Sequence, residues 1–168
     1  MCLTDSLPII LSKRAYQAKV ALGIADKGFC STKDLYYQGV KFHFLGPDRY
    51  GKMPLPEQMQ FTQASANDLT VLKTLLPRLY NRWVVGDKIF ASTPTNEQVA
   101  AQQVQILTPI KLKKGQKRLD AAHQYFSTYV SSIRQPVESF VNWLIEKTQI
   151  QSASKGRSEK GLWLHCYG

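Results

Sequence analysis

Three acidic residues along this chain have types and positions that suit metal-dependent chemistry. Asp5 lies in "CLTDSLPI", Asp87 lies in "WVVGDKIF" and Glu138 lies in "SSIRQPVESFVNWLIEKT". Each acid alone has an ordinary explanation, which is turn chemistry for the two aspartates and a surface ion pair with Arg134 for Glu138. If the three carboxylates converge, they repel one another and need cations, and carboxylate oxygens suit Mg²⁺ or Mn²⁺.

The chemistry that such a cluster performs is the cleavage of phosphodiester bonds. Two divalent ions about 3.5–4 Å apart activate a water or hydroxyl and stabilise the leaving oxygen. The charge of the chain agrees with such a substrate, because 22 Lys+Arg against 12 Asp+Glu give a net charge of +10. This excess predicts a polyanionic partner, with nucleic acid first and an anionic membrane surface second, unless it only keeps the protein soluble.

Basic residues near the acids are candidates for contacts with DNA phosphates. The stretch "KLKKGQKR" carries five positive charges in eight residues, and it is either a phosphate-binding loop or a solvated basic loop. Lys88 either contacts the scissile phosphate or extends its stem at a strand end. His43, on an alternating strand, is more typical of a structural residue. The residues expected to bind DNA are Lys88, Lys111, Lys113, Lys114, Lys117, Arg118 and Lys147.

The elements that must position these residues follow from hydrophobic periodicity. "YYQGVKFHFLG" and "LPEQMQFTQAS" alternate with period 2 and predict an antiparallel hairpin. "NDLTVLKTLLPRLY" and "TPTNEQVAAQQVQ" predict helices, the second with Thr93 as its cap and Pro94 at its first position. "RWVVGDKIF" and "ILTPIKLKK" predict strands, and Asp5 and Asp87 lie side by side if their strands are parallel neighbours. This order predicts an α/β fold with a mixed sheet.

A long helix is predicted from about Leu119 to Thr148. Its apolar stripe continues across Pro136, which is expected to kink or restart the helix and so to aim Glu138 at the two aspartates. Residues 149–168 are predicted to be a loop or tail, and the whole chain, 1–168, is predicted to be a single domain. The stripe comprises Leu119, Ala122, Phe126, Tyr129, Ile133, Val137, Phe140 and Leu144.

Composition excludes several other classes of protein. Cys2, Cys30 and Cys166 are far apart and form no C-x-x-C pair, so they indicate neither a zinc site nor a disulfide framework. No apolar run approaches the ~20 residues of a membrane span, and the N-terminus lacks the pattern of a signal peptide. The sequence therefore predicts a soluble intracellular protein.

Several segments together resemble the bacterial insertion-sequence transposases of the DDE superfamily. They are "TDSLPI", "KGFCSTKDLYYQGVKFHFLG", "ASANDLTVLKTLLPRL", "VVGDKIF" and "SSIRQPVESFVNWLIEKTQIQSASKGRSEKGL". The resemblance is strongest to the insertion sequence 982 type, related to the insertion sequence 4 type, and it covers nearly the whole chain in one order. It implies a ribonuclease-H-like mixed sheet flanked by helices, and cutting and joining of transposon ends.

The same resemblance implies the site and its partners. Asp5, Asp87 and Glu138 would hold two Mg²⁺ or Mn²⁺ ions, and Arg134 would orient Glu138 or contact phosphate. The partners would be DNA, as transposon ends and target, and a second copy in a homodimer. No membrane and no small-molecule cofactor would be involved. The place of action would be the bacterial cytoplasm, at the nucleoid when bound to DNA.

Two departures from the family pattern support an alternative. Ser131 and Ile145 stand where the insertion sequence 4 type has Tyr and Lys around the glutamate, and Lys147 follows two residues later. The family's N-terminal DNA-binding region is also expected to be lacking. The chain is then a truncated, inactive remnant that only binds DNA or a transposase partner. A third interpretation, a junction-resolving nuclease, shares the acids but not the extended match.

Overall fold

The computed structural model describes residues 1–154 and 158–167. The chain gathers into two compact units. The first consists of 1–5, 44–58 and 68–140, and the second of 6–43, 59–67 and 141–168. Three long elements contribute residues to both units: β1 (Cys2–Ser12), β3 (Leu35–Pro47) and α3 (Ala121–Thr148).

Parallel strands form the centre of the first unit. The start of β1 pairs in parallel with β5 (Arg82–Val85), with Leu3 opposite Val85, and β5 pairs in parallel with β6 (Val104–Leu107). On the other side of β1, the Thr4 hydroxyl donates to the carbonyl of Phe44 in β3 at 2.9 Å. The strands that carry Asp5 and Asp87 are therefore parallel neighbours.

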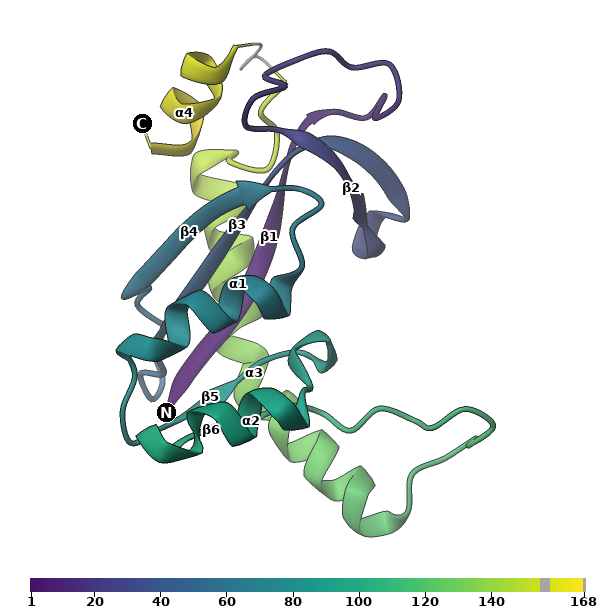
Figure 1. Ribbon diagram of the computed structural model, residues 1–168, viewed down its shortest axis with the longest axis vertical. Helices are drawn as coiled ribbons and strands as arrows, with labels where there is room; N and C mark the ends of the chain where they lie inside the picture. Colours follow the sequence, from purple (N-terminus) through teal and green to yellow (C-terminus); the bar gives the residue numbers. More distant parts are fainter. Residues whose placement is uncertain (155–157, 168) are drawn as a thin grey trace. The chain divides into compact units, whose positions relative to one another are not determined.

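Two helices pack on these strands around one apolar core. They are α1 (Asp68–Leu75) and α2 (Thr93–Val99), and Figure 1 shows both in front of the strands, with α3 behind. The predicted cap Thr93 is wrong, because Ser92 accepts from the backbone N–H of Thr95 at 3.3 Å. Pro94 is the second residue of the helix rather than the predicted first, and it still lies in the first turn, where a missing N–H costs little. The core consists of Cys2, Leu45, Leu72, Leu75, Leu76, Leu79, Val84, Phe90, Val99, Val104 and Ile106.

Short 3₁₀ turns extend the elements of the first unit. Leu76–Arg78 follows α1, Lys88–Phe90 follows β5 and Ala100–Gln102 follows α2. The second of these begins directly after Asp87, so the end of β5 turns sharply at the candidate site.

Helix α3 is continuous through its proline. The predicted restart at Pro136 is wrong, since one lost backbone bond does not break a helix whose Val130 and Val137 are buried on either side. The apolar stripe predicted through Phe126 and Tyr129 is also wrong, because these rings are exposed and Ser127 and Val130 are buried instead. Periodicity predicted the helix and its buried Val137 and Phe140, but it misplaced the buried face of the N-terminal half by about one residue.

The second unit is built on antiparallel pairing. Strand β2 (Asp26–Cys30), which was not predicted, pairs with β3 from Asp26 opposite Gly39 to Cys30 opposite Leu35. Strand β4 (Gln58–Gln63) also pairs with β3, as the predicted hairpin requires. Parallel pairing in one unit and antiparallel pairing in the other confirm the α/β fold with a mixed sheet.

The C-terminal segment is not the predicted loop. Residues Glu159–Tyr167 form helix α4, in which Leu162 is fully buried. Its rings Trp163 and Tyr167 lie 6.0 and 5.0 Å from the ring of Phe61. These contacts stabilise a short helix that follows a Ser- and Lys-rich stretch, while residues 155–157 and 168 of the expected tail lie outside the described residues. No helix of the described chain is long and apolar enough to cross a membrane.

Candidate active site

The register of β1 against β5 brings two of the predicted acids to the same level. Leu3 lies opposite Val85, and Asp5 and Asp87 each follow these partners by two residues. Arg134 from α3 joins them, with Nη2 3.0 Å from Oδ2 of Asp5 and Nη1 3.6 Å from Oδ1 of Asp87. Three residues far apart in the sequence thus form one charged cluster.

The local structure around Asp87 is set by Gly86 and a 3₁₀ turn. A Cβ at Gly86 would lie 2.7 Å from the ring of Phe90 and 3.0 Å from Cγ2 of Thr4, so only glycine lets the chain pass here. The Asp87 carboxylate then accepts from the backbone N–H of Lys88 at 2.6 Å and caps the turn Lys88–Phe90. This bond fixes the carboxylate beside the strand end while half of its side chain stays exposed.

Asp5 does not lie in a turn, which is its ordinary explanation from the sequence. Strand β1 continues from Cys2 to Ser12, so the carboxylate projects from the interior of the strand. The sequence near Asp5 misleads because Ser6 and Pro8 are typical of turns, whereas here Leu7 and Ile9 are buried and keep the chain extended.

Arg134 neutralises the repulsion between the two aspartates. Its side chain is only 13% exposed, and its Nε is buried without a hydrogen-bond partner in the described structure. The two Nη groups therefore anchor the guanidinium, one to Asp5 on β1 and the other to Asp87, just after the end of β5. A planar guanidinium is suited to such a bridge, whereas a lysine would present one point charge.

Glu138 does not join this cluster directly. Its side chain is exposed, and in the described part of the chain no three His, Cys, Asp or Glu side chains gather as a group that could hold a metal ion. Glu138 follows Arg134 by four residues on α3, so it lies on the same face of the helix one turn away. Arg134 contacts the two aspartates, and the expectation that it orients Glu138 or contacts phosphate stays a prediction.

A basic groove of about 680 Å³ begins next to this cluster, at Lys88. We call it the α3 groove. The β6–α3 loop forms one wall with Lys117 and Arg118, and the backbone N–H of Ile110 donates to the Ser127 hydroxyl of α3 at 2.9 Å, which ties the loop to the helix. Its full lining is Lys88, Pro109, Ile110, Leu112, Lys117, Arg118, Leu119, Gln124, Ser127, Thr128 and Ser131.

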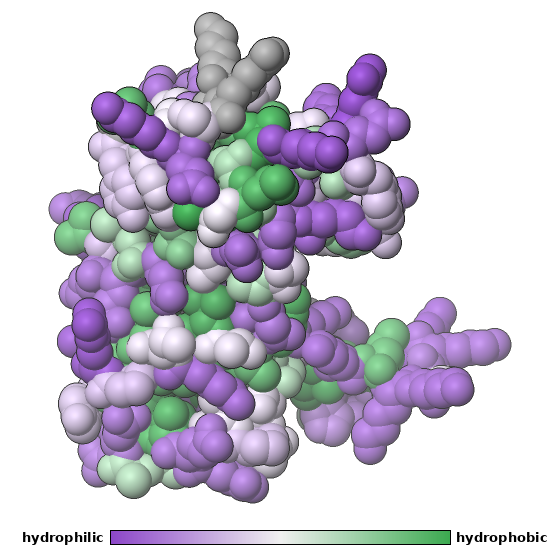
Figure 2. Space-filling model, turned by 45° about the horizontal axis from the view of Figure 1, so that its top comes forward, coloured by the Kyte–Doolittle hydropathy of each residue, from purple (hydrophilic) through white to green (hydrophobic). Residues whose placement is uncertain are grey.

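The rest of the basic loop is exposed. Lys111, Lys113 and Lys114 all project into solvent, and the tip turns at Gly115, whose φ is +85°. Figure 1 shows this loop extending away from the strands of its unit, and in Figure 2 the projecting segment is mostly hydrophilic. The stretch "KLKKGQKR" is thus accessible to a polyanion over its whole length.

A comparison with protein families decides what kind of chain this is. The model of the transposase DDE domain matches residues 13–160. The chain belongs to this family. The match to the transposase DDE domain includes Asp87, Arg134 and Glu138, whereas Asp5 precedes it. Searches of curated proteins and of solved structures gave no match.

Two expected residues of this transposase domain lie in its second unit. Lys147 pairs with Glu146, with Nζ 3.1 Å from Oε1. His43 is buried and its Nε2 lies 2.9 Å from the hydroxyl of Thr62, which fits the structural role that its strand pattern favours.

The polar residues of the α3 groove were missed in the sequence. Gln124, Thr128 and Ser131 share one face of α3 at helical spacing. Their signal in the sequence is a set of polar residues that recur beside the apolar stripe, and Ser131 also departs from the motif of the insertion sequence 4 type. Hydroxyl and amide groups beside lysines suit the oxygen atoms of a phosphodiester backbone.

Proposed function

We propose that this chain is the catalytic core of a DNA transposase, with a ribonuclease-H-like fold of the insertion sequence 982 type. It would cut strands at insertion-sequence ends and transfer the freed 3′-hydroxyl to target DNA. The observation that carries the proposal is the register of β1 and β5, which sets Asp5 beside Asp87 under one arginine. Membership of the transposase DDE domain family gives this pair its interpretation.

The donor set fits divalent metal ions. Two carboxylates from adjacent parallel strands are already held against one cationic group, so this position favours positive charge. Asp5, Asp87 and Glu138 would hold two Mg²⁺ or Mn²⁺ ions, with Glu138 joining from the same face of α3 as Arg134. When bound, such ions activate the attacking hydroxyl and stabilise the leaving oxygen of a phosphodiester.

The residues of the chain itself have separate tasks in this proposal. Arg134 keeps the two aspartates together, and it would be able to contact a DNA phosphate if the aspartates held metal ions instead. Lys88 lies between the acids and the α3 groove, so it connects the cutting site to the bound backbone. Lys117 and Arg118 hold that backbone within the groove, and the exposed loop lysines and Lys147 add attraction over a longer range.

The test is cleavage of supercoiled plasmid by the 168-residue chain with Mg²⁺ or Mn²⁺. We expect nicked circles with metal and none with a chelator. Asp87→Asn should lose at least about two orders of magnitude in rate, because it removes one metal ligand while keeping the cap to Lys88. Asp34→Asn is the matched control, since Asp34 is exposed in the second unit and has a left-handed backbone that Asn tolerates.

Two outcomes would contradict the proposal. Equal nicking by the Asp87→Asn variant and the unchanged chain would exclude this metal site. Salt-sensitive DNA binding without nicking, and without Mn²⁺ binding in a calorimetric titration, would show the alternative of a remnant that binds DNA but does not cut it.

A further inference from the structure

The second unit carries a group of exposed aromatic rings that the proposed active site does not use. Tyr16 is 75% exposed, and Phe29 and Tyr36 are each about half exposed. The ring centroids of Phe29 and Tyr36 are 5.0 Å apart, and those of Tyr16 and Tyr36 are 6.0 Å apart. Aromatic rings gathered on a surface mark an interaction site more often than isolated ones do. We call these three residues the tyrosine surface.

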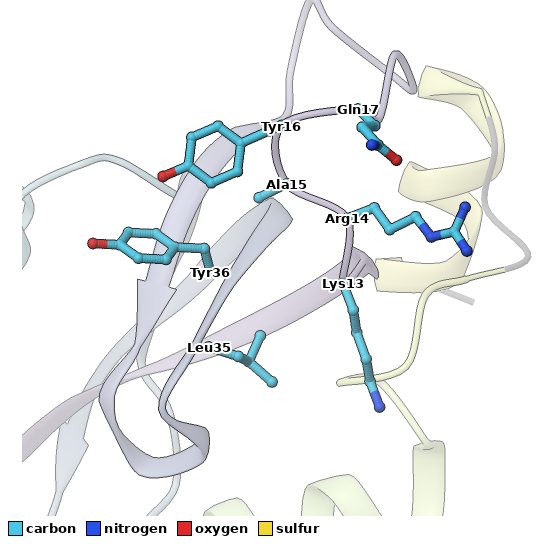
Figure 3. A pocket seen from close by; sticks show the side chains of 7 residues that line it. All are labelled: Lys13, Arg14, Ala15, Tyr16, Gln17, Leu35 and Tyr36. Carbon is cyan, nitrogen blue, oxygen red and sulfur yellow. The ribbon is translucent and has the colours of Figure 1, made fainter.

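Cations lie directly beside this surface. The Lys27 ammonium stands 4.1 Å from the ring centroid of Tyr16 and 5.2 Å from that of Tyr36. A cavity of about 390 Å³ has Tyr16 and Tyr36 in its lining together with Lys13 and Arg14. Figure 3 shows the two rings extending together on one side of the 13–17 segment, whereas Lys13 and Arg14 extend from its other side.

A second, larger cavity continues from the same segment. It has a volume of about 810 Å³ and shares Lys13, Arg14 and Gln17 with the first. Its other charged lining residues are Lys19 and Lys33, and the hydroxyls of Ser12, Ser152 and Ser154 lie among them. Rings therefore border a concave surface in which cations and hydroxyls predominate.

We propose that this surface binds unpaired, single-stranded DNA, with bases stacked on the rings of Tyr16 and Tyr36 and phosphates in the adjoining basic cavities. The rings decide between unpaired and duplex DNA. Cations alone attract either form, but a base presents its face to a protein ring only when it has no stacked neighbour there. Since the site lies outside the acidic cluster, it rests on the proposed function only in taking DNA as the ligand.

The acids near the surface leave its positive character intact. Asp26 accepts from the backbone N–H of Ser65 at 2.8 Å and also from the Ser65 hydroxyl, so it is engaged in holding β2. Asp34 is exposed at the end of the short 3₁₀ turn Ser31–Lys33. Between residues 13 and 36, five cations face these two acids, and an extended anionic strand meets a net attraction.

The experiment measures binding of the full chain to a fluorescein-labelled dT₁₂ strand and to a 12-base-pair duplex by anisotropy, in EDTA so that no cleavage occurs. Tyr16→Ala should weaken dT₁₂ binding by about 5-fold or more, the effect of losing one stacked base, and should change duplex binding by less than about 2-fold. Tyr16→Phe should bind like the unchanged chain, because it keeps the ring. Tyr50→Ala, at a fully exposed tyrosine of the first unit, is the matched control.

Three results would overturn the proposal. The first is unchanged dT₁₂ binding by Tyr16→Ala, and the second is equal weakening of single-strand and duplex binding by this variant. The third is a Tyr16→Ala variant that no longer binds phosphatidylserine vesicles but still binds dT₁₂ normally, which would indicate a membrane surface as the ligand. The binding assay contains no metal ion, so its result does not depend on whether the chain cleaves DNA. In the same way, a failure of the binding assay leaves the cleavage test unaffected. Tyr16 lies in a loop and is mostly exposed, so the variant is expected to fold, which circular dichroism checks.

Discussion

The α3 groove and the tyrosine surface are both basic, yet they differ in what stands beside the charge. In the groove, Lys117 and Arg118 face the hydroxyls of Thr128 and Ser131, and none of its described lining residues is aromatic. On the tyrosine surface, Lys27 stands over two rings. Hydroxyls and cations contact the backbone of either kind of DNA, whereas exposed rings contact bases.

This difference shows that the net charge of a surface does not by itself indicate how the surface binds DNA. The excess of +10 predicted a polyanion, and each region accounts for part of it. Only the neighbouring side chains distinguish a groove for a backbone from a platform for unpaired bases. The groove begins at the residue after Asp87, so backbone binding is the mode that would serve the proposed cutting at this site.

The largest effect is expected at the residue that holds the aspartates together. Arg134→Ala leaves Asp5 and Asp87 next to each other without a counter-charge, and should lower the free energy of unfolding by about 1–2 kcal/mol. This is less than the cost of breaking a fully buried pair, since Asp87 is half exposed. Urea unfolding measures the change.

Metal ions sharpen this test. If Mg²⁺ binds where the guanidinium now lies, millimolar Mg²⁺ should restore more stability to the Arg134→Ala variant than it adds to the unchanged chain. Equal stabilisation of both proteins would contradict a shared position for the arginine and the metal. Tyr16→Ala, in the other region, should show no such dependence on Mg²⁺.

A second test separates the two regions by their salt dependence. The double variant Lys117→Ala/Arg118→Ala should weaken duplex binding and reduce the slope of log affinity against log salt by about 2, because each cation accounts for about one phosphate contact. Tyr16→Ala should leave this slope unchanged. Lys73→Ala/Arg78→Ala is the matched control, since it removes two exposed cations of the first unit that do not line the groove. An unchanged slope in the double variant would show that the loop is only solvated.

A smaller effect is expected from the hydroxyls of the groove. Ser131→Ala should weaken duplex binding by about 2- to 5-fold, the value of one exposed hydrogen bond, without a change in the salt slope. Ser139→Ala is a suitable control, because Ser139 is an exposed serine of the same helix whose hydroxyl donates to the carbonyl of Gln135. Equal binding by the Ser131→Ala and unchanged chains would limit the groove to its charges.

The sequence predicted those parts of the fold that local patterns determine. Leu72 and Leu75 recur with helical spacing, and they line the core of the first unit as α1 requires. Val40, Phe42 and Phe44 alternate, and all three are buried in β3. Asp5 and Asp87 were predicted to lie side by side only if their strands pair in parallel, and the parallel pairing of β1 with β5 is confirmed.

Other elements depend on contacts that no local pattern reveals. Strand β2 pairs with β3 although it contains Gly28, a poor strand residue, and glycine is needed there because a Cβ would lie 2.7 Å from that of Ala64. Helix α4 depends on Phe61, about 100 residues earlier in the sequence.

Arg134 contacts Asp5 and Asp87, which are far from it and from each other in the sequence. The three residues were therefore predicted individually, whereas their contacts were not. Glu138 is exposed and does not gather with the two aspartates in the described structure, and its binding of a metal ion together with them stays a proposal.

The smallest effect concerns the start of α3, the helix that carries one wall of the groove. The Asp120 carboxylate accepts from the backbone N–H of His123 at 3.0 Å, and also contacts its ring. The backbone bond first, and the ring second, lower the pKa of Asp120 from its ordinary value of 3.8. The contribution of the ionised Asp120 carboxylate to stability is therefore fully present at pH values above 3.8, and it is lost as the pH falls through the lowered pKa.

Carboxyl ¹³C titration by NMR should place the midpoint of Asp120 below 3.8. In a His123→Ala variant the midpoint should rise only in part, because the helix N–H remains when the ring is removed. A complete return to the ordinary value would show that the ring sets the pKa. The cap would then be a side-chain pair that adds little to the order of α3, and the wall of the groove would depend on the bond between Ile110 and Ser127 instead.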